Sequence, residues 1–94
     1  MVIHTIVTFV VIGLSWYLKI SNVELMFIVL AMGLVFALEL VNTAIENVVD
    51  MSMPNMHPLA KNAKDMASGA VLVSSIIAVI INLIIFVPKI IDMF

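Results

Sequence analysis

The sequence predicts an all-α integral membrane protein with three transmembrane helices, and three observations carry that prediction. Of 94 residues, 65% are hydrophobic and 11% are charged, whereas a soluble domain has roughly 45–50% apolar and about 25% charged residues. The mean hydropathy is +1.32, and so small a fold leaves much of its surface exposed. The apolar residues also form three long runs between short polar segments. This excess of apolar surface requires lipid around it.

The first predicted span covers residues 2–18 and ends at a polar turn, residues 19–22. It lies near the lower limit of about 17–25 residues that cross ~30 Å of hydrocarbon. No Lys or Arg precedes the run and no small-residue cleavage site is evident, so we expect a retained span and not a signal peptide. Trp16 and Tyr17 beside Lys19 fit an interfacial aromatic belt.

The second predicted span covers residues 23–50. At about 1.5 Å per residue it reaches roughly 42 Å, more than the ~30 Å hydrocarbon core. Glu39, Asn42, Glu46 and Asp50 all lie in its C-terminal half, so we expect that end to project into water.

The third predicted span covers residues 59–87 and follows a break at residues 51–58, where Pro54 and Pro58 exclude a continuous helix. Its first three turns are polar, residues 70–87 are apolar, and Pro88 is expected to end it. No repeat, linker or low-complexity segment divides the chain, so we predict one domain over residues 1–94.

Charge and composition exclude several classes of function. The net charge is −2 and there is no Arg, so no basic face exists to bind nucleic acid. Without Cys there is no disulfide, thiolate metal site or cysteine nucleophile. His4 and His57 are too few and too far apart for a histidine metal site. The Gly-rich phosphate loops of soluble kinases are absent.

A polar stripe on the second helix is the main functional signal. At about 100° per residue, positions 39, 46 and 50 lie within roughly 20° of one line, with Asn42 about 60° away. Glu39 lies about 24 Å along the span, roughly 6 Å inside the boundary. Because a carboxylate inside the membrane is costly, it indicates function. That depth suits the hydroxyl group of a membrane lipid.

The start of the third helix carries a second polar face. Lys61, Lys64, Asp65 and Ser68 share the spacing i, i+3, i+4, i+7. Carboxylates opposite lysines can hold a divalent cation and nucleotide phosphates. Spacing alone leaves two functions equally open, an enzyme at the membrane surface and a small cation transporter that uses Glu39. The remaining charged residues fit membrane anchors: Lys19, Glu24, Lys89 and Asp92.

Two longer segments resemble the prokaryotic diacylglycerol kinase family, which includes the undecaprenol kinases. They are ELVNTAIENVVD at residues 39–50 and HPLAKNAKDMASGAV at residues 57–71. The pattern E-x-x-N-[ST]-A-[IV]-E-x-x-V-D, followed by A-K-D, is long and specific, and the likeness covers residues 2–89. The HPLAK form and the FVPK ending at residues 86–89 are more similar to the undecaprenol kinase branch.

The resemblance implies an ATP- and Mg²⁺-dependent lipid kinase whose acceptor is undecaprenol, with diacylglycerol as the alternative. It also implies a trimeric helical bundle, a homotrimer that shares active sites between subunits at the cytoplasmic side of the cell membrane. The lysine count near the spans is a tie, so only the resemblance places the 51–58 loop in the cytoplasm. A non-catalytic membrane subunit or cation transporter is the rival, and the A-K-D motif argues against it.

Site roles follow from the resemblance, residue by residue. Glu39 is implied as the general base that binds the lipid hydroxyl, and Glu46 as the ligand of Mg²⁺ that also contacts the nucleotide. Asn42 and Ser68 are implied to line the lipid site. The remaining nucleotide contacts are implied at Asn55, Met56, His57, Lys64 and Asp65.

One departure from the family pattern lies at the N-terminus. Family members begin with an amphipathic surface helix that ends in a segment like E-x-x-F-R-I-H, whose Glu is a second metal ligand. This sequence begins Met1-Val2-Ile3-His4 and matches only the tail of that segment. The alternatives are a start upstream, a shortened chain and a degenerate member. Because the matched residues of the body are intact, we expect a truncated start.

Overall fold

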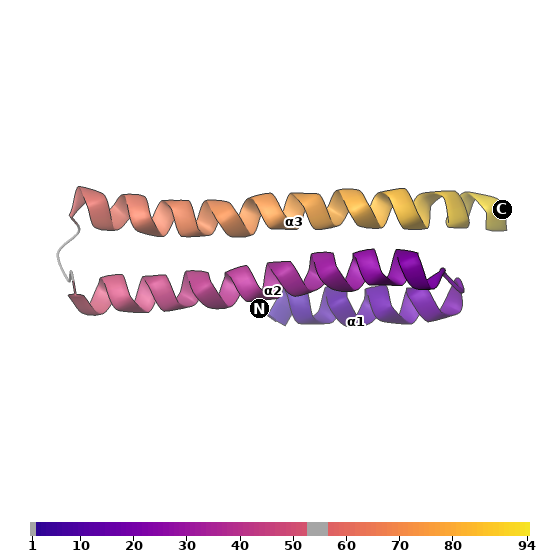
Figure 1. The fold of residues 1–94 in the computed structure, drawn as a ribbon, viewed down its shortest axis with the longest axis horizontal. Helices are drawn as coiled ribbons and strands as arrows, with labels where there is room; N and C mark the ends of the chain where they lie inside the picture. Colours follow the sequence, from indigo (N-terminus) through magenta and orange to yellow (C-terminus); the bar gives the residue numbers. More distant parts are fainter. Residues whose placement is uncertain (1, 53–56) are drawn as a thin grey trace.

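The computed structural model describes residues 2–52 and 57–94 and forms three α-helices (Figure 1). They are α1 at Val2–Tyr17, α2 at Asn22–Ser52 and α3 at Pro58–Met93. The described residues contain no strand, which confirms the predicted all-α class.

Local hydrogen bonds define where α2 and α3 begin. Ser21 Oγ accepts from the Glu24 backbone N–H at 3.2 Å, and Glu24 Oε1 accepts from the Ser21 N–H at 3.1 Å, which is a reciprocal capping box. At α3, His57 Nδ1 accepts from the Leu59 N–H at 3.1 Å and Pro58 occupies the first turn, where its missing donor costs nothing.

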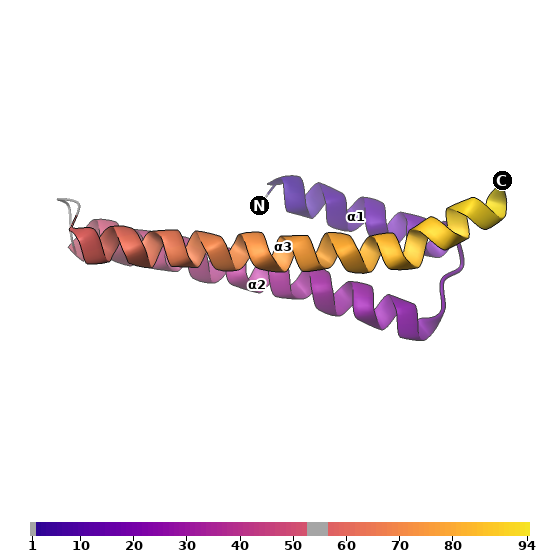
Figure 2. The same ribbon diagram turned by 90° about the horizontal axis from the view of Figure 1, so that it is seen from above.

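The end of α3 corrects the expectation that Pro88 closes the third helix. The helix passes through Pro88 and continues to Met93. A proline inside a helix removes one hydrogen bond and crowds the carbonyl of the residue four before it, here Ile84, so it bends the helix without having to end it. Figure 2 shows α3 bending near its C-terminal end.

The helices form a long antiparallel hairpin of α2 and α3, with the shorter α1 beside the first half of α2 (Figures 1 and 2). The molecule measures 55 × 20 × 17 Å. Helix α1 begins about halfway along the hairpin, whereas α2 ends and α3 begins at one far end (Figure 1). Among the described residues, the backbone of α1 approaches α2 more closely than it approaches α3. The half of the hairpin that contains the end of α2 and the start of α3 extends beyond α1 (Figure 1).

The buried core lies where all three helices meet. Ile28 and Val35 of α2 are 1% and 2% exposed, and they cluster with Val11 of α1 and Phe86 of α3. Ala31 of α2 and Ala78 of α3 are also buried in this cluster; small side chains of this kind let helix backbones approach closely.

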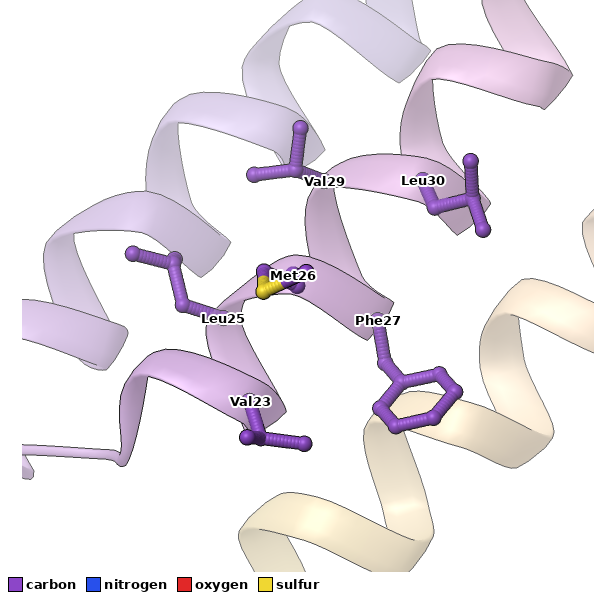
Figure 3. Close-up of a pocket in the computed structure, with 6 residues that line it drawn as sticks. All are labelled: Val23, Leu25, Met26, Phe27, Val29 and Leu30. Atoms are coloured by element: carbon purple, nitrogen blue, oxygen red, sulfur yellow. The ribbon is translucent and has the colours of Figure 1, made fainter.

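Most other apolar side chains point outward. Figure 3 shows such a face on α2, where a surface hollow of about 530 Å³ is lined only by apolar side chains. Leu25 and Val29 project to the α1 side and Phe27 and Leu30 to the opposite side (Figure 3). Such a surface suits lipid.

Two helices, α2 and α3, are long and apolar enough to cross a membrane, whereas α1 is a shorter apolar helix of 16 residues. At about 1.5 Å per residue α1 reaches roughly 24 Å, close to the lower limit for a span.

Candidate functional site

The polar residues of α2 and α3 lie in the half of the hairpin that extends beyond α1. The C-terminal half of α2 runs beside the first turns of α3 there, and the N-terminal turn of α1 reaches the inner edge of this region (Figures 1 and 2). The two sequence faces singled out above therefore share one end of the molecule.

Glu39 is the innermost carboxylate of the polar stripe. Its side chain is 13% exposed, against 63% for Asp50 near the end of the same helix. His4 of α1 contacts it, with Nδ1 of the imidazole against Oε1 of the carboxylate. Glu39 is thus an embedded carboxylate with a polar neighbour from another helix.

Asn42 and Glu46 interact one helical turn apart on α2. The Asn42 side-chain amide donates to Glu46 Oε1 at 3.2 Å, a typical i, i+4 pair. The other amide atom, Asn42 Oδ1, is buried and has no hydrogen-bond partner within the described residues. Two oxygen-bearing side chains are therefore fixed beside each other just outside Glu39.

Lys64 links the polar end of α3 to that of α2. Its Nζ lies 2.8 Å from Asp50 Oδ1, and the lysine side chain is 25% exposed. The cation thus lies near the end of the hairpin where α2 ends and α3 begins, and its side chain stays partly exposed.

Other predicted site residues are not brought into this arrangement. Asp65 and Ser68 are exposed, and their side chains make no hydrogen bond or ion pair to the residues described. His57 is exposed and caps α3 through Nδ1, so its other ring nitrogen remains available. Asn55 and Met56 lie outside the described residues.

A metal site within one chain is limited to a few oxygen ligands. No group of three or more His, Asp or Glu side chains that could hold a metal gathers in the described parts of the chain. Mg²⁺ commonly binds through one or two carboxylates plus substrate phosphates and water. Glu46 and the buried, unpartnered Asn42 Oδ1 fit that kind of partial site.

His4 is the polar neighbour that sequence reasoning missed. The available signal was an imidazole in an otherwise apolar helix, since α1 contains no Lys, Arg, Asp or Glu. Which residue it meets depends on how α1 lies on α2, and spacing within one helix cannot give that.

An apolar groove opens beside this contact. It has a volume of about 370 Å³ and is lined by Met32 and Val35 of α2 together with side chains of α1 and α3. His4 lines the groove, and so does Asn82, whose amide donates to the Ala78 carbonyl at 2.7 Å. The His4–Glu39 pair therefore lies beside an apolar groove that all three helices line.

Comparison with known proteins agrees with these observations. A sequence profile described as prokaryotic diacylglycerol kinase matches residues 1–86. An undecaprenol kinase from Bacillus subtilis (strain 168) is 51% identical over 75 residues, which are 80% of this chain and 61% of that protein. A diacylglycerol kinase from Synechocystis is 39% identical over 92 residues, 97% of this chain and 53% of the relative.

A diacylglycerol kinase from Escherichia coli (strain K12) is 37% identical over 67 residues, 71% of this chain and 55% of that protein. No solved structure matches the chain. The chain thus spans between about half and three fifths of the length of these relatives. The matched residues include the polar stripe of α2 and the start of α3, and the chain belongs to the prokaryotic diacylglycerol kinase family.

Proposed function

We propose that this chain transfers the terminal phosphoryl group of ATP to the hydroxyl group of a membrane lipid, with undecaprenol as the acceptor. The observation that carries the proposal is the placement of Glu39. It is an embedded carboxylate beside an apolar groove, and it begins a polar stripe that leads to Asp50 and Lys64, where α2 ends and α3 begins. Undecaprenol is favoured because the relative with 51% identity carries that name.

Glu39 acts as the general base in this proposal. As the lipid oxygen forms its bond to phosphorus and the bond between phosphorus and ADP breaks, the hydroxyl proton passes to the Glu39 carboxylate. A positioned base contributes typically about 10²–10⁴-fold to a rate. Since little covalent chemistry is left to the protein, positioning and charge neutralisation do the rest. Asn42 and Ser68 would line the lipid site.

Mg²⁺ would be held by Glu46 with the nucleotide phosphates, and Asn42 Oδ1 is the neighbouring neutral oxygen. When bound, the metal would supply charge neutralisation on the phosphates. In the chain itself, the hydrogen bond from Asn42 to Glu46 fixes the carboxylate that would meet it.

ATP would approach from the water-exposed end. Lys64 would neutralise phosphate charge, a role that a point charge such as ammonium can perform. Glu46, Asp65 and His57 would complete the nucleotide contacts together with Asn55 and Met56. The exposure of Asp65 and His57 is compatible with this role.

In the membrane, we propose that all three helices span, with the α2–α3 connection on the cytoplasmic side. We also propose a homotrimer whose active sites are shared between subunits. The exposed Asp65 and Ser68 support sharing, because a chain of three helices cannot enclose two polar faces. A strictly monomeric preparation with full activity, measured by light scattering in detergent, would contradict this.

The test is transfer of labelled phosphate from Mg·ATP to undecaprenol and to diacylglycerol in the same detergent. We expect the higher kcat/KM with undecaprenol. A higher value with diacylglycerol would select the alternative acceptor, which the names of the Synechocystis and Escherichia coli relatives favour. No phosphorylated lipid, together with proton or cation flux in liposomes, would instead support a transporter.

A further inference from the structure

We propose that His4 is a positioning residue for Glu39: its imidazole holds one carboxylate oxygen so that the carboxylate faces the lipid hydroxyl. This inference rests on the proposed function, in which Glu39 accepts the hydroxyl proton. It adds a residue from α1 to a site that the sequence places on α2 and α3.

The contact joins two helices at the level where α1 begins. Nδ1 of His4 meets Oε1 of Glu39, and the two side chains are 30% and 13% exposed. The backbone around His4 is fixed as well, because its carbonyl accepts from the Thr8 hydroxyl at 2.7 Å. The imidazole is therefore presented to Glu39 from an ordered turn of α1.

The chemistry of the two groups sets which of them would donate. The two atoms meet as a close contact and not as an aligned hydrogen bond. The proposal places the proton on His4 Nδ1, because an ionised carboxylate can only accept. A hydrogen bond to an ionised carboxylate is shorter and stronger than one between neutral groups. Holding Oε1 from α1 fixes the rotation of the carboxylate and hence the direction of its acceptor sites.

The surroundings favour a role in the reaction over general solvation of a buried charge. His4 also lines the groove between α1 and α3, together with the apolar Val7, Val35 and Val79. A lipid alcohol that reaches Glu39 from within the membrane would pass this imidazole. A mere solvating group would serve equally well on any side of Glu39.

The first test is ¹⁵N NMR of the full 94-residue chain with labelled histidine, and it needs no turnover. We expect a proton on His4 Nδ1, whereas neutral His57 has a bare Nδ1 because that atom accepts from Leu59. Glu39→Gln should shift the His4 ring signals, and the remote control Glu24→Gln should leave them unchanged. A bare His4 Nδ1, or His4 signals that do not respond to Glu39→Gln, would overturn the inference.

The second test is steady-state kinetics with undecaprenol and Mg·ATP. We expect His4→Ala to lower kcat about 10- to 100-fold, as loss of positioning does, with the KM for ATP unchanged within about twofold. His4→Asn, whose amide can donate from a similar place, should restore kcat to within about threefold. Ile6→Ala, an exposed α1 position, is the control and should behave like the wild type.

A double substitution shows whether His4 acts through Glu39. In a Glu39→Asp background the shorter carboxylate loses the contact with His4. Adding His4→Ala should then lower kcat by less than about twofold. An equal loss in both backgrounds would mean an independent role and overturn the inference.

The kinetic outcomes also separate this inference from the proposed function. If His4→Ala keeps the wild-type kcat while Glu39→Gln is inactive, His4 has no positioning role and the proposed function still stands. A fully active Glu39→Gln removes the base on which the inference depends, and removes the inference with it.

Discussion

Lys64 Nζ of α3 lies 2.8 Å from Asp50 Oδ1 of α2 and closes the polar end of the helical hairpin. The pair joins the two segments that carry the family pattern, 39–50 and 57–71. It places a lysine cation about three turns beyond Glu39 along the direction of α2. In the proposed function, nucleotide phosphates that approach from water towards a lipid hydroxyl at Glu39 would contact the Lys64 ammonium.

Lys64→Ala should therefore raise the KM for ATP about 10-fold or more, since the charged hydrogen bond from Lys64 to the nucleotide phosphates would be lost. Asp50→Asn removes the partner and keeps the lysine, so we expect the KM for ATP to change less than about threefold, as for most exposed ion pairs. Lys61→Ala, an exposed lysine one turn earlier on α3, is the matched control. If Asp50→Asn and Lys64→Ala weaken ATP binding equally, Lys64 acts only by joining the helices.

The dependence on Mg²⁺ should respond to Asn42. Its amide donates to Glu46 Oε1, and removal of a group that orients a metal ligand typically costs about 10- to 100-fold in metal affinity. We expect Asn42→Ala to raise the Mg²⁺ concentration for half-maximal activity about 10-fold. Asn47→Ala, an exposed neighbour of Glu46, should leave it unchanged. An unchanged Mg²⁺ requirement in Asn42→Ala would remove Glu46 from the metal site.

Much of the fold could be predicted because residues close together in the sequence determine each helix. The apolar runs, the Ser21–Glu24 capping box and the Pro58 start are decided by residues close together in the chain. The prediction that Pro88 ends the third helix was wrong, because whether a proline ends a helix or only bends it depends on the surroundings of that helix. In a membrane a bent helix is favoured over an exposed backbone.

The candidate site could be predicted only in part. The α2 stripe follows from helical periodicity, and the Asn42–Glu46 pair confirms that these two side chains share a face. The His4–Glu39 contact depends on how α1 lies against α2, which no spacing within one helix gives. Asp65 and Ser68 remain exposed in the chain, so their predicted roles stay predictions.

The packing of the hairpin predicts a stability difference between two apolar positions on α2. Ile28 is 1% exposed in the shared core, whereas Leu30 is 72% exposed on the outer face. Ile28→Ala should lower the free energy of unfolding in detergent by about 1–3 kcal/mol through the cavity it leaves. Leu30→Ala should lower it by less than about 0.5 kcal/mol. Equal losses in a denaturant titration would contradict the assignment of Ile28 to the shared core.

The central claim is that Glu39 accepts the proton of a lipid hydroxyl during phosphoryl transfer. Its most direct measurement is the transfer of labelled phosphate from Mg·ATP to undecaprenol by Glu39→Gln. Glu24→Gln serves as the matched control, since Glu24 pairs with Lys89 at 3.1 Å at the other end of α2. We predict a kcat at least about 100-fold lower for Glu39→Gln, with the KM for ATP nearly unchanged and Glu24→Gln like the wild type. Wild-type kcat in Glu39→Gln would contradict the account.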